Sequence, residues 1–228
     1  MKLKKLKTKS NENNRSLFLK DKIGFERLGL MTSQLWYDDP KGLLFSLSRY
    51  KFVSKILSGS QNVLELGCGD GFQSRIVQQN VKNLELSDHD PLFIEDIKLR
   101  NHKKWSIKSF VHNMCNNPTK NIYDAIYALD VFEHISKNKE NLFLSNITKS
   151  LKQKGIVIFG MPSLESQKHA SVLSKMGHVN CKTAVDLKKF LNKFFFHVSI
   201  FSMNDEVVHT GFYKMAHYLF AVCYFNKK

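Results

Sequence analysis

Three glycines in alternating positions follow a short apolar segment. Residues 63–66 read Val-Leu-Glu-Leu, and Gly67, Gly69 and Gly71 come directly after them. Glycine lets the backbone turn sharply and approach a ligand closely, because it carries no Cβ atom. In an open α/β sheet, ligands lie beyond the carboxyl ends of the strands. The pattern therefore predicts a ligand-binding turn at the end of a strand.

The residues around this turn favour a cationic ligand over a dinucleotide. A dinucleotide-binding turn reads G-x-G-x-x-G, and Phe72 occupies the place of its third glycine. The carboxylate of Glu65 would repel phosphates and attract the ammonium and sulfonium groups of S-adenosylmethionine. Farther on, Asp88 ends a second apolar segment, where it could accept hydrogen bonds from both ribose hydroxyls.

Strands and helices alternate along the chain. We expect seven strands, at 63–66, 84–86, 107–111, 125–129, 156–159, 198–201 and 216–223. We expect helices at about 40–58, 72–79, from 91, at 139–151 and after the Thr183-x-x-Asp186 capping box. A polar loop over about 163–182 interrupts the alternation, and loops of this kind commonly bind ligands. The order predicts an α/β fold with a doubly wound, mainly parallel sheet.

Four segments in this order resemble the motifs of class I, Rossmann-like S-adenosylmethionine-dependent methyltransferases, in particular the ubiquinone-biosynthesis-like small-molecule branch. They are 63–71 (VLELGCGDG), 111–114 (VHNM), 123–134 (YDAIYALDVFEH) and 151–162 (LKQKGIVIFGMP). The family usually has an acidic residue where this chain has Asn113, and a glycine where it has Lys154. The resemblance implies a seven-stranded sheet whose last strand is antiparallel, with S-adenosylmethionine as the cofactor.

The resemblance also implies which residues hold the cofactor. They are Glu65, Gly67, Cys68, Gly69, Asp88, His89, Asn113, Met114, Leu129 and Asp130. The side-chain oxygen of Asn113 can still accept a hydrogen bond from the adenine amino group. Arg49, late in the first long helix, is either a partner of the cofactor carboxylate or an exposed helical residue.

Two histidines are candidate catalytic residues. Methyl transfer from a sulfonium is an in-line displacement, so a general base is needed only where the acceptor carries a proton. His134 follows the fourth expected strand and His178 lies in the loop after the fifth, and both are expected at the cofactor edge of the sheet. For His134, the alternative is a local hydrogen-bonding role at a helix start.

Candidate acceptor-binding residues come from the same loop and from the N-terminal region. His178 and Asn180 lie in the polar loop, whereas Trp36 and Tyr37 precede the first long helix. In related methyltransferases such N-terminal segments close over the substrate, although both aromatic residues could equally pack in the core. We expect no metal ion, because residues 160–163 lack the Asp-Asn pair that holds magnesium in catechol-type enzymes.

Length and composition fit one domain. The chain has 228 residues, and no apolar run approaches the ~20 residues of a membrane-spanning helix. We expect a basic, flexible tail at 1–20 and a single domain at 21–228, with a helical cap at about 21–60. The basic residues 1–7 are followed by polar residues 11–14 and not by an apolar stretch, which favours a cytoplasmic protein. The four cysteines are scattered and form no C-x-x-C pair, which favours reduced thiols.

The expected function is methyl transfer from S-adenosylmethionine to a small-molecule acceptor, with a hydroxyl group of a sugar, quinone or other metabolite preferred. The net charge of +15 leaves an RNA methyltransferase with a basic tail as one alternative. The lysines are spread along the whole chain, however, so nucleic acid is the less favoured partner. A non-catalytic binding protein with a cofactor fold is the other alternative. The oligomeric state stays open.

Overall fold

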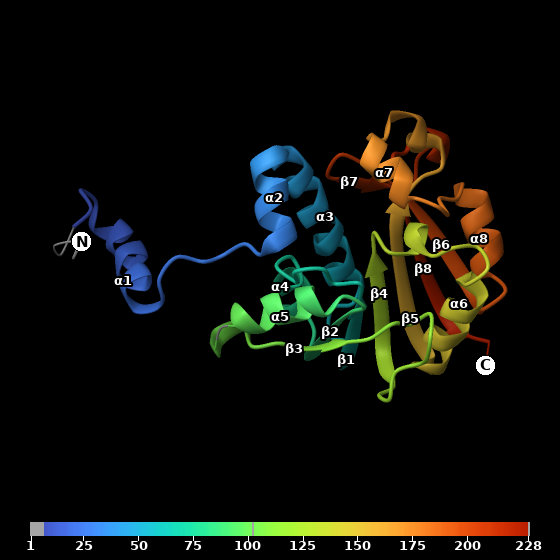
Figure 1. Cartoon of the computed structure of the whole chain (residues 1–228), viewed down its shortest axis with the longest axis horizontal. Helices are drawn as coiled ribbons and strands as arrows, with labels where there is room; N and C mark the ends of the chain where they lie inside the picture. Colours follow the sequence, from blue (N-terminus) through green and yellow to red (C-terminus); the bar gives the residue numbers. More distant parts are fainter. Residues whose placement is uncertain (1–6, 102, 228) are drawn as a thin grey trace.

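The computed structural model describes residues 7–101 and 103–227, which form a sheet with helices on both of its faces (Figure 1). The strands are β1 (Asn62–Leu66), β2 (Asn83–Asp88), β3 (Lys108–Val111), β4 (Tyr123–Leu129), β5 (Leu151–Pro162), β6 (Phe195–Asn204), β7 (Val207–His209) and β8 (Tyr218–Asn226). The α-helices are α1 (Asn14–Ile23), α2 (Leu30–Asp38), α3 (Pro40–Ile56), α4 (Arg75–Gln78), α5 (Pro91–Leu99), α6 (Glu140–Lys149), α7 (Val172–Gly177) and α8 (Ala184–Leu191). The short 3-10 helices are η1 (Asn11–Asn13), η2 (Lys103–Trp105), η3 (Phe132–His134), η4 (Glu165–His169) and η5 (Tyr213–Met215).

The strand order is β3-β2-β1-β4-β5-β8-β6-β7. Strands β1 to β5 pair in parallel with their neighbours, and β8 pairs antiparallel to both β5 and β6. The chain winds outward from β1 to β3 and then returns to add β4 on the other side of β1. This reversal creates a switch point at the carboxyl ends of β1 and β4, which is where ligands bind in sheets of this kind.

Successive residues of the central strands face opposite helical layers. On β4, Ile126 and Ala128 pack in one hydrophobic cluster with the inner faces of α6 and α8, whereas Ala125 and Tyr127 pack in a second cluster with α3, α4 and α5. All four residues are fully buried. A central strand covered on both faces needs apolar side chains at every position, which is why this segment is almost continuously apolar.

The mainly parallel α/β sheet with an antiparallel last strand is confirmed, but the sheet has eight strands where the sequence predicts seven. The additional strand is β7, which folds back on the end of β6, so that Asn204 pairs with Val207. Asp205 takes a left-handed conformation in the two-residue turn between them, with φ of 50°. Aspartate tolerates this conformation better than most residues, which permits a tight hairpin.

The first described residues form a helix that stands apart from the body (Figure 1). None of the residues of α1 is buried, and the expected end of the basic tail, residue 20, lies inside this helix. Residues 1–6 of the expected tail lie outside the described residues, and its flexibility stays a prediction. Helices α2 and α3 occupy the region expected to form the cap. None of the helices in the described ranges combines the length and apolarity that crossing a bilayer requires.

Candidate active site

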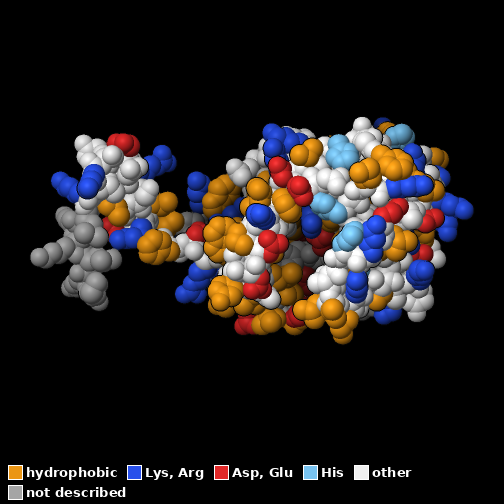
Figure 2. Space-filling view, turned by 90° about the horizontal axis from the view of Figure 1, so that it is seen from above, with side chains coloured by type: hydrophobic (Ala, Val, Ile, Leu, Met, Phe, Trp, Pro, Cys, Tyr) orange, Lys and Arg blue, Asp and Glu red, His pale blue; other side chains and the backbone are white. Residues whose placement is uncertain are grey.

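A cleft of about 930 Å³ opens at the switch point of the sheet. Residues that follow β1, β2, β3 and β4 line it, and so do residues of α2 and α3 and of the segment that begins at η3. In the view from above, Figure 2 shows the body hollowed, with acidic and histidine side chains gathered at the rim. Pockets that bind small molecules measure roughly 300–1,000 Å³, so there is room here for a cofactor and a small second ligand.

The glycine turn after β1 brings its backbone close to the walls of the cleft. Gly67 and Gly69 adopt φ of 66° and 51°, which side chains with a Cβ atom rarely allow. A Cβ atom on Gly69 would lie 2.8 Å from the sulfur of Met31 on α2, and one on Gly67 would collide with Val131. Only glycine therefore permits this close packing.

Asp88 ends β2 directly beside this turn. Its Oδ2 accepts a hydrogen bond from the Gly69 N–H (3.0 Å), and its Oδ1 accepts one from the Asp90 N–H (2.9 Å). These bonds fix the carboxylate at the cleft wall, where it is 5% exposed, while the neighbouring His89 is 75% exposed along its side chain. A carboxylate with remaining lone pairs at this edge of the sheet can accept hydrogen bonds from a ribose diol.

Glu65 lies behind the wall of the cleft. Its carboxyl group accepts hydrogen bonds from the hydroxyls of Tyr50 (2.8 Å) and Tyr127 (2.5 Å), and Tyr50 itself lines the cleft. Burial raises the pKa of Glu65 to about 7, although the two tyrosine hydroxyls oppose the shift by stabilising the charged form. Near neutral pH, a cation entering the cleft would therefore favour loss of this proton.

Asn113 and Met114, after β3, line the cleft. The Asn113 Oδ1 accepts a hydrogen bond from the Cys115 N–H (2.9 Å), which leaves this oxygen one lone pair for an adenine amino group. The Met114 carbonyl accepts a hydrogen bond from Asn146 (2.9 Å). The loop after β3 is thus fastened both internally and to α6.

Asp130, after β4, forms an ion pair with Arg49 of α3. The Asp130 Oδ2 lies 2.7 Å from Arg49 Nη1, and the guanidinium carbon lies 4.0 Å from the centre of the Tyr218 ring. Leu129 and Asp130 both line the cleft, as predicted for cofactor-binding positions. Arg49 lines it too, but its charge already has a partner, so the expected role as a partner of the cofactor carboxylate is not supported.

Two histidines meet at the rim although 44 positions separate them in the sequence. The His134 and His178 rings have centroids 5.2 Å apart, and His134 lines the cleft. His134 Nδ1 lies 2.8 Å from the Gly177 carbonyl oxygen, and His178 Nδ1 lies 2.9 Å from the side-chain oxygen of Gln167. Burial and the neighbouring His134 lower the pKa of His178, so its imidazole is neutral near pH 7.

The chain matches the family model described as a methyltransferase domain over residues 40–198. It belongs to the methyltransferase family. The matched range begins at α3 and ends within β6, so it contains the glycine turn, Asp88 and both histidines of the rim. No curated protein matches the sequence.

Several solved methyltransferase structures have the same fold. The N-methyltransferase NodS from Bradyrhizobium japonicum WM9, in complex with S-adenosyl-L-homocysteine, is 20% identical over 85% of this chain and 91% of its own, with a TM-score of 0.59. The methyltransferase domain of bacterial CtHen1 is 18% identical over 79% and 98%, with a TM-score of 0.66. The plantazolicin methyltransferase BpumL, also with S-adenosylhomocysteine, is 15% identical over 85% and 93%, with a TM-score of 0.61.

Together with the family match, these structures confirm the predicted class, an S-adenosylmethionine-dependent methyltransferase, and the predicted cofactor. The ubiquinone-biosynthesis-like branch is not confirmed by them and stays a prediction.

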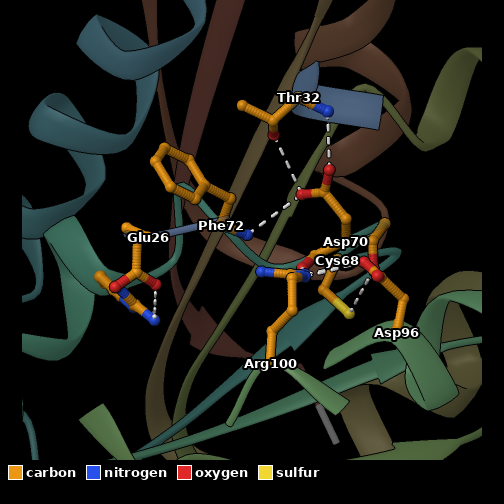
Figure 3. A network of polar contacts seen from close by, with 9 residues as sticks. Glu26, Thr32, Cys68, Asp70, Phe72, Asp96 and Arg100 are labelled. Carbon is orange, nitrogen blue, oxygen red and sulfur yellow. Dashed lines mark hydrogen bonds and ion pairs between the residues drawn. The ribbon is translucent and has the colours of Figure 1, made fainter. Parts of the chain in front are cut away.

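Asp70 fastens α2, which lines the methyltransferase cleft, to the glycine turn (Figure 3), an interaction that the sequence did not reveal. Its carboxylate accepts hydrogen bonds from the backbone N–H (2.6 Å) and the hydroxyl (3.0 Å) of Thr32, in the first turn of α2. The first N–H groups of a helix lack partners within the helix, so a carboxylate there satisfies them and interacts favourably with the helix dipole. Arg100 in turn donates a hydrogen bond to the Asp70 carbonyl and pairs with Asp96 (2.8 Å).

We expect Asp70→Ala to loosen α2 from the cleft. The substitution removes both hydrogen bonds from Thr32 to a charged acceptor, each worth roughly 1.5–3 kcal/mol, and a third from the Phe72 N–H (3.1 Å) within the turn. Hydrogen exchange followed by mass spectrometry should therefore show faster exchange over Leu30–Asp38 and little change in β4. Thr32→Ser keeps both donors and serves as the control, with exchange like that of the native protein. Unchanged exchange in Asp70→Ala would show that other contacts hold α2.

The predicted acceptor residues on α2 do not line the cleft. Trp36 and Tyr37 are 56% and 88% exposed, whereas Gln34, Leu35 and Asp38 turn toward the cleft. A helix presents only one face to a neighbouring cavity, and the two aromatic residues lie off that face. Their prediction as cleft residues is therefore not supported by this arrangement.

Asn180, also predicted to bind the acceptor, does not line the cleft either. It is 1% exposed, and its side-chain nitrogen donates hydrogen bonds to the Ile135 carbonyl (2.9 Å) and to Glu140 (3.0 Å). Its backbone N–H donates to the Glu133 carbonyl (2.9 Å). Asn180 thus holds the loop after β5 against η3, which brings His178 to His134.

Proposed function

We propose that this methyltransferase transfers the methyl group of S-adenosylmethionine to a hydroxyl group of a small molecule. The meeting of His134 and His178 at the rim of the cleft is the observation that carries the proposal. Histidine is the side chain best suited to accept a hydroxyl proton near neutral pH, and an amine that is already unprotonated needs no such group.

The cleft divides into two ends under this proposal. At the cofactor end, the ribose binds Asp88, and the glycine turn and the loop after β3 hold the rest of the cofactor; the residues proposed for contact are Gly67, Cys68, Gly69, His89, Asn113, Met114, Leu129 and Asp130. Glu65 acts from behind the wall, through its charge. The acceptor lies between the sulfonium and the two histidines, and α2, fastened by Asp70, closes the cleft from the other side.

The methyl group of S-adenosylmethionine is already activated, so the enzyme mainly has to align the acceptor with it. The acceptor oxygen attacks the methyl carbon in line with the carbon–sulfur bond; the new carbon–oxygen bond forms as the old bond breaks, and the electron pair stays on sulfur. The hydroxyl proton leaves toward the histidines. Enclosure by α2 excludes water from the sulfonium. A metabolite acceptor of the size of a sugar or quinone fits the volume of the cleft better than a folded macromolecule does.

Calorimetric titration followed by an acceptor screen tests the proposal. We expect S-adenosylmethionine and S-adenosylhomocysteine to bind with micromolar affinity and NADH to show no heat of binding. A panel of hydroxyl and amine metabolites, together with total RNA, is then incubated with methyl-labelled cofactor, and label is expected in a hydroxyl metabolite.

Three results would contradict the proposal in different ways. Labelling of amines alone would contradict the hydroxyl acceptor. Labelling of RNA that falls when residues 1–20 are removed would favour the RNA methyltransferase with a basic tail. The absence of cofactor binding would favour a non-catalytic binding protein.

A further inference from the structure

Three potential metal ligands from two distant segments meet beside the cleft, which His134 lines. Glu133 and His134 belong to η3, and His178 follows α7; one ligand atom from each lies within 4.8 Å of the other two. We propose that Glu133, His134 and His178 bind a divalent transition-metal ion. Two imidazoles and one carboxylate are a ligand set that suits Zn²⁺, Mn²⁺, Fe²⁺ or Co²⁺ and leaves coordination positions open.

The carboxylate of Glu133 lacks the partners that a buried charge requires. Its side chain is fully buried, and among the described residues no other residue donates a hydrogen bond to either of its oxygens. Buried carboxylates are otherwise paired with cations or hydrogen-bond donors, or they coordinate a metal. The cations close by are engaged elsewhere, since Arg49 pairs with Asp130 and Lys182 pairs with Glu140. A metal ion would supply the missing partner.

Both histidines are held in the tautomer that a metal site needs. The Gly177 carbonyl oxygen can only accept a hydrogen bond, so His134 Nδ1 carries the proton, and the lone pair is on Nε2. The side-chain oxygen of Gln167 orients His178 in the same way. Histidines that ligate metals almost always donate their second N–H to a carbonyl or carboxylate, because this fixes the ring and its basicity.

The backbone around the three residues is clamped. Asn180 bonds to the carbonyls of Glu133 and Ile135, which joins the loop after β5 to η3 on both sides of His134. A Cβ atom on Gly177 would lie 3.2 Å from the His134 ring, so this glycine lets α7 end directly against the imidazole. At metal–ligand distances of ~2.0–2.2 Å, the three ligand atoms, now within 4.8 Å of one another, must move closer together when the ion binds.

The metal ion would give the proposed methyl transfer a more specific mechanism, and its catalytic role rests on that proposed function. A hydroxyl group bound to a divalent cation loses its proton to solvent more readily, and the resulting oxygen attacks the methyl carbon while the electron pair of the carbon–sulfur bond remains on sulfur. With the ion bound, the imidazole lone pairs are occupied, so solvent and not His134 or His178 takes the proton, and the two imidazoles act on the acceptor through the ion. The sequence predicts no metal ion because it lacks the carboxylate and Asp-Asn pair after the fifth strand, whereas histidines from two distant segments form no local pattern.

Metal titration of the full chain tests the site without an acceptor. The protein is freed of metal with a chelator and titrated with ZnCl₂ by calorimetry and with CoCl₂ by visible absorption. We expect one equivalent of ion bound at the site and Co²⁺ absorption bands typical of imidazole and carboxylate ligation. Glu133→Gln and His178→Ala should each weaken binding at least roughly tenfold, since even changes around a metal ligand commonly cost 10- to 100-fold.

The matched control is His169→Ala, which removes an exposed histidine of η4 from the same loop and should bind the ions like the native chain. Equal affinity in the native chain and in both ligand variants would overturn the metal site. His178→Ala changes a half-buried side chain, so it keeps the test decisive if Glu133→Gln does not fold. Titration with S-adenosylhomocysteine on the same samples separates the two proposals: cofactor binding with no metal binding refutes the metal site alone, and metal binding without cofactor binding refutes the proposed function alone.

Discussion

Replacing Asp88 with alanine should weaken the binding of S-adenosylmethionine by about 10- to 100-fold while the protein stays folded. The variant loses the hydrogen bonds from a carboxylate to the ribose hydroxyls, which corresponds to roughly 1 to 3 kcal/mol. It also frees the Gly69 N–H, so the glycine turn loses its tie to β2. Calorimetric titration with the cofactor measures the loss, and circular dichroism checks the fold.

Two further variants make this result specific. Asp88→Asn keeps the size and one acceptor oxygen, so we expect an affinity between those of the native protein and Asp88→Ala. Glu95→Ala removes an exposed carboxylate of α5 that does not line the cleft and should change affinity only slightly. If Asp88→Ala binds the cofactor as tightly as the native protein, Asp88 does not contact the ribose.

The elements of the parallel sheet were predictable because their signals are local. The apolar segment before Gly67 and the fully apolar segment 125–129 are strands in the structure, and Thr183 caps α8 by accepting a hydrogen bond from the Asp186 N–H (3.1 Å) as expected. Each of these features depends on residues fewer than six positions apart. The antiparallel last strand came instead from the resemblance to a family, since local patterns do not specify how distant strands pair.

The contacts that close the site could not be predicted, because they join residues far apart in the sequence. Thr32 and Asp70 are 38 positions apart, and neither residue type is unusual on its own. His134 and His178 were each placed at the correct edge of the sheet, but only the folded loop brings them together. No local sequence pattern indicates which residues of this kind will meet in the folded protein.

Other predictions depend on which way a side chain points and what already binds it. Trp36 and Tyr37 were predicted to bind the acceptor because they are aromatic. They lie in a nine-residue helix whose apolar residues form only a weak stripe, so the sequence did not show which face of the helix is buried. Arg49 and Asn180 carry suitable groups for a ligand, yet Asp130 and Glu140 occupy them. Partner residues decide whether a polar group is available, and these are known only from the fold.

The affinity for S-adenosylmethionine should rise with pH up to about pH 7, and Glu65→Gln should remove this dependence. Burial, opposed by hydrogen bonds from two tyrosines, gives Glu65 a pKa of about 7, so below pH 7 the free protein carries a proton there. The cationic cofactor favours the charged carboxylate, and binding below pH 7 therefore releases that proton. The increase is limited to tenfold per pH unit, since one proton is involved.

The glutamine variant should bind the cofactor weakly at every pH, because it keeps the size of the side chain but never acquires the negative charge. Calorimetry at pH 5, 6, 7 and 8 measures both effects. Glu85→Gln is the matched control: Glu85 also accepts a hydrogen bond from a tyrosine hydroxyl (Tyr123, 2.6 Å), but Tyr123, unlike Tyr50, does not line the cleft. Glu85→Gln should keep the native pH dependence of cofactor affinity. If the cofactor affinity of Glu65→Gln still rises with pH, the proton released on binding belongs to another group.

The same ionisation should appear in the stability of the protein without cofactor. Glu65 has its ordinary pKa of 4.5 in the unfolded chain and about 7 in the folded one. Between these values the folded state holds a proton that the unfolded state has released, so the free energy of unfolding should fall as pH rises from 4.5 to 7, by about 3 kcal/mol at most. Urea unfolding at each pH measures the free energy of unfolding of the native protein and of Glu65→Gln. In the variant, this free energy should lack the decrease that Glu65 causes. Parallel curves for the two proteins would mean that Glu65 is already charged when the cleft is empty, and the cofactor would then meet a fixed negative charge.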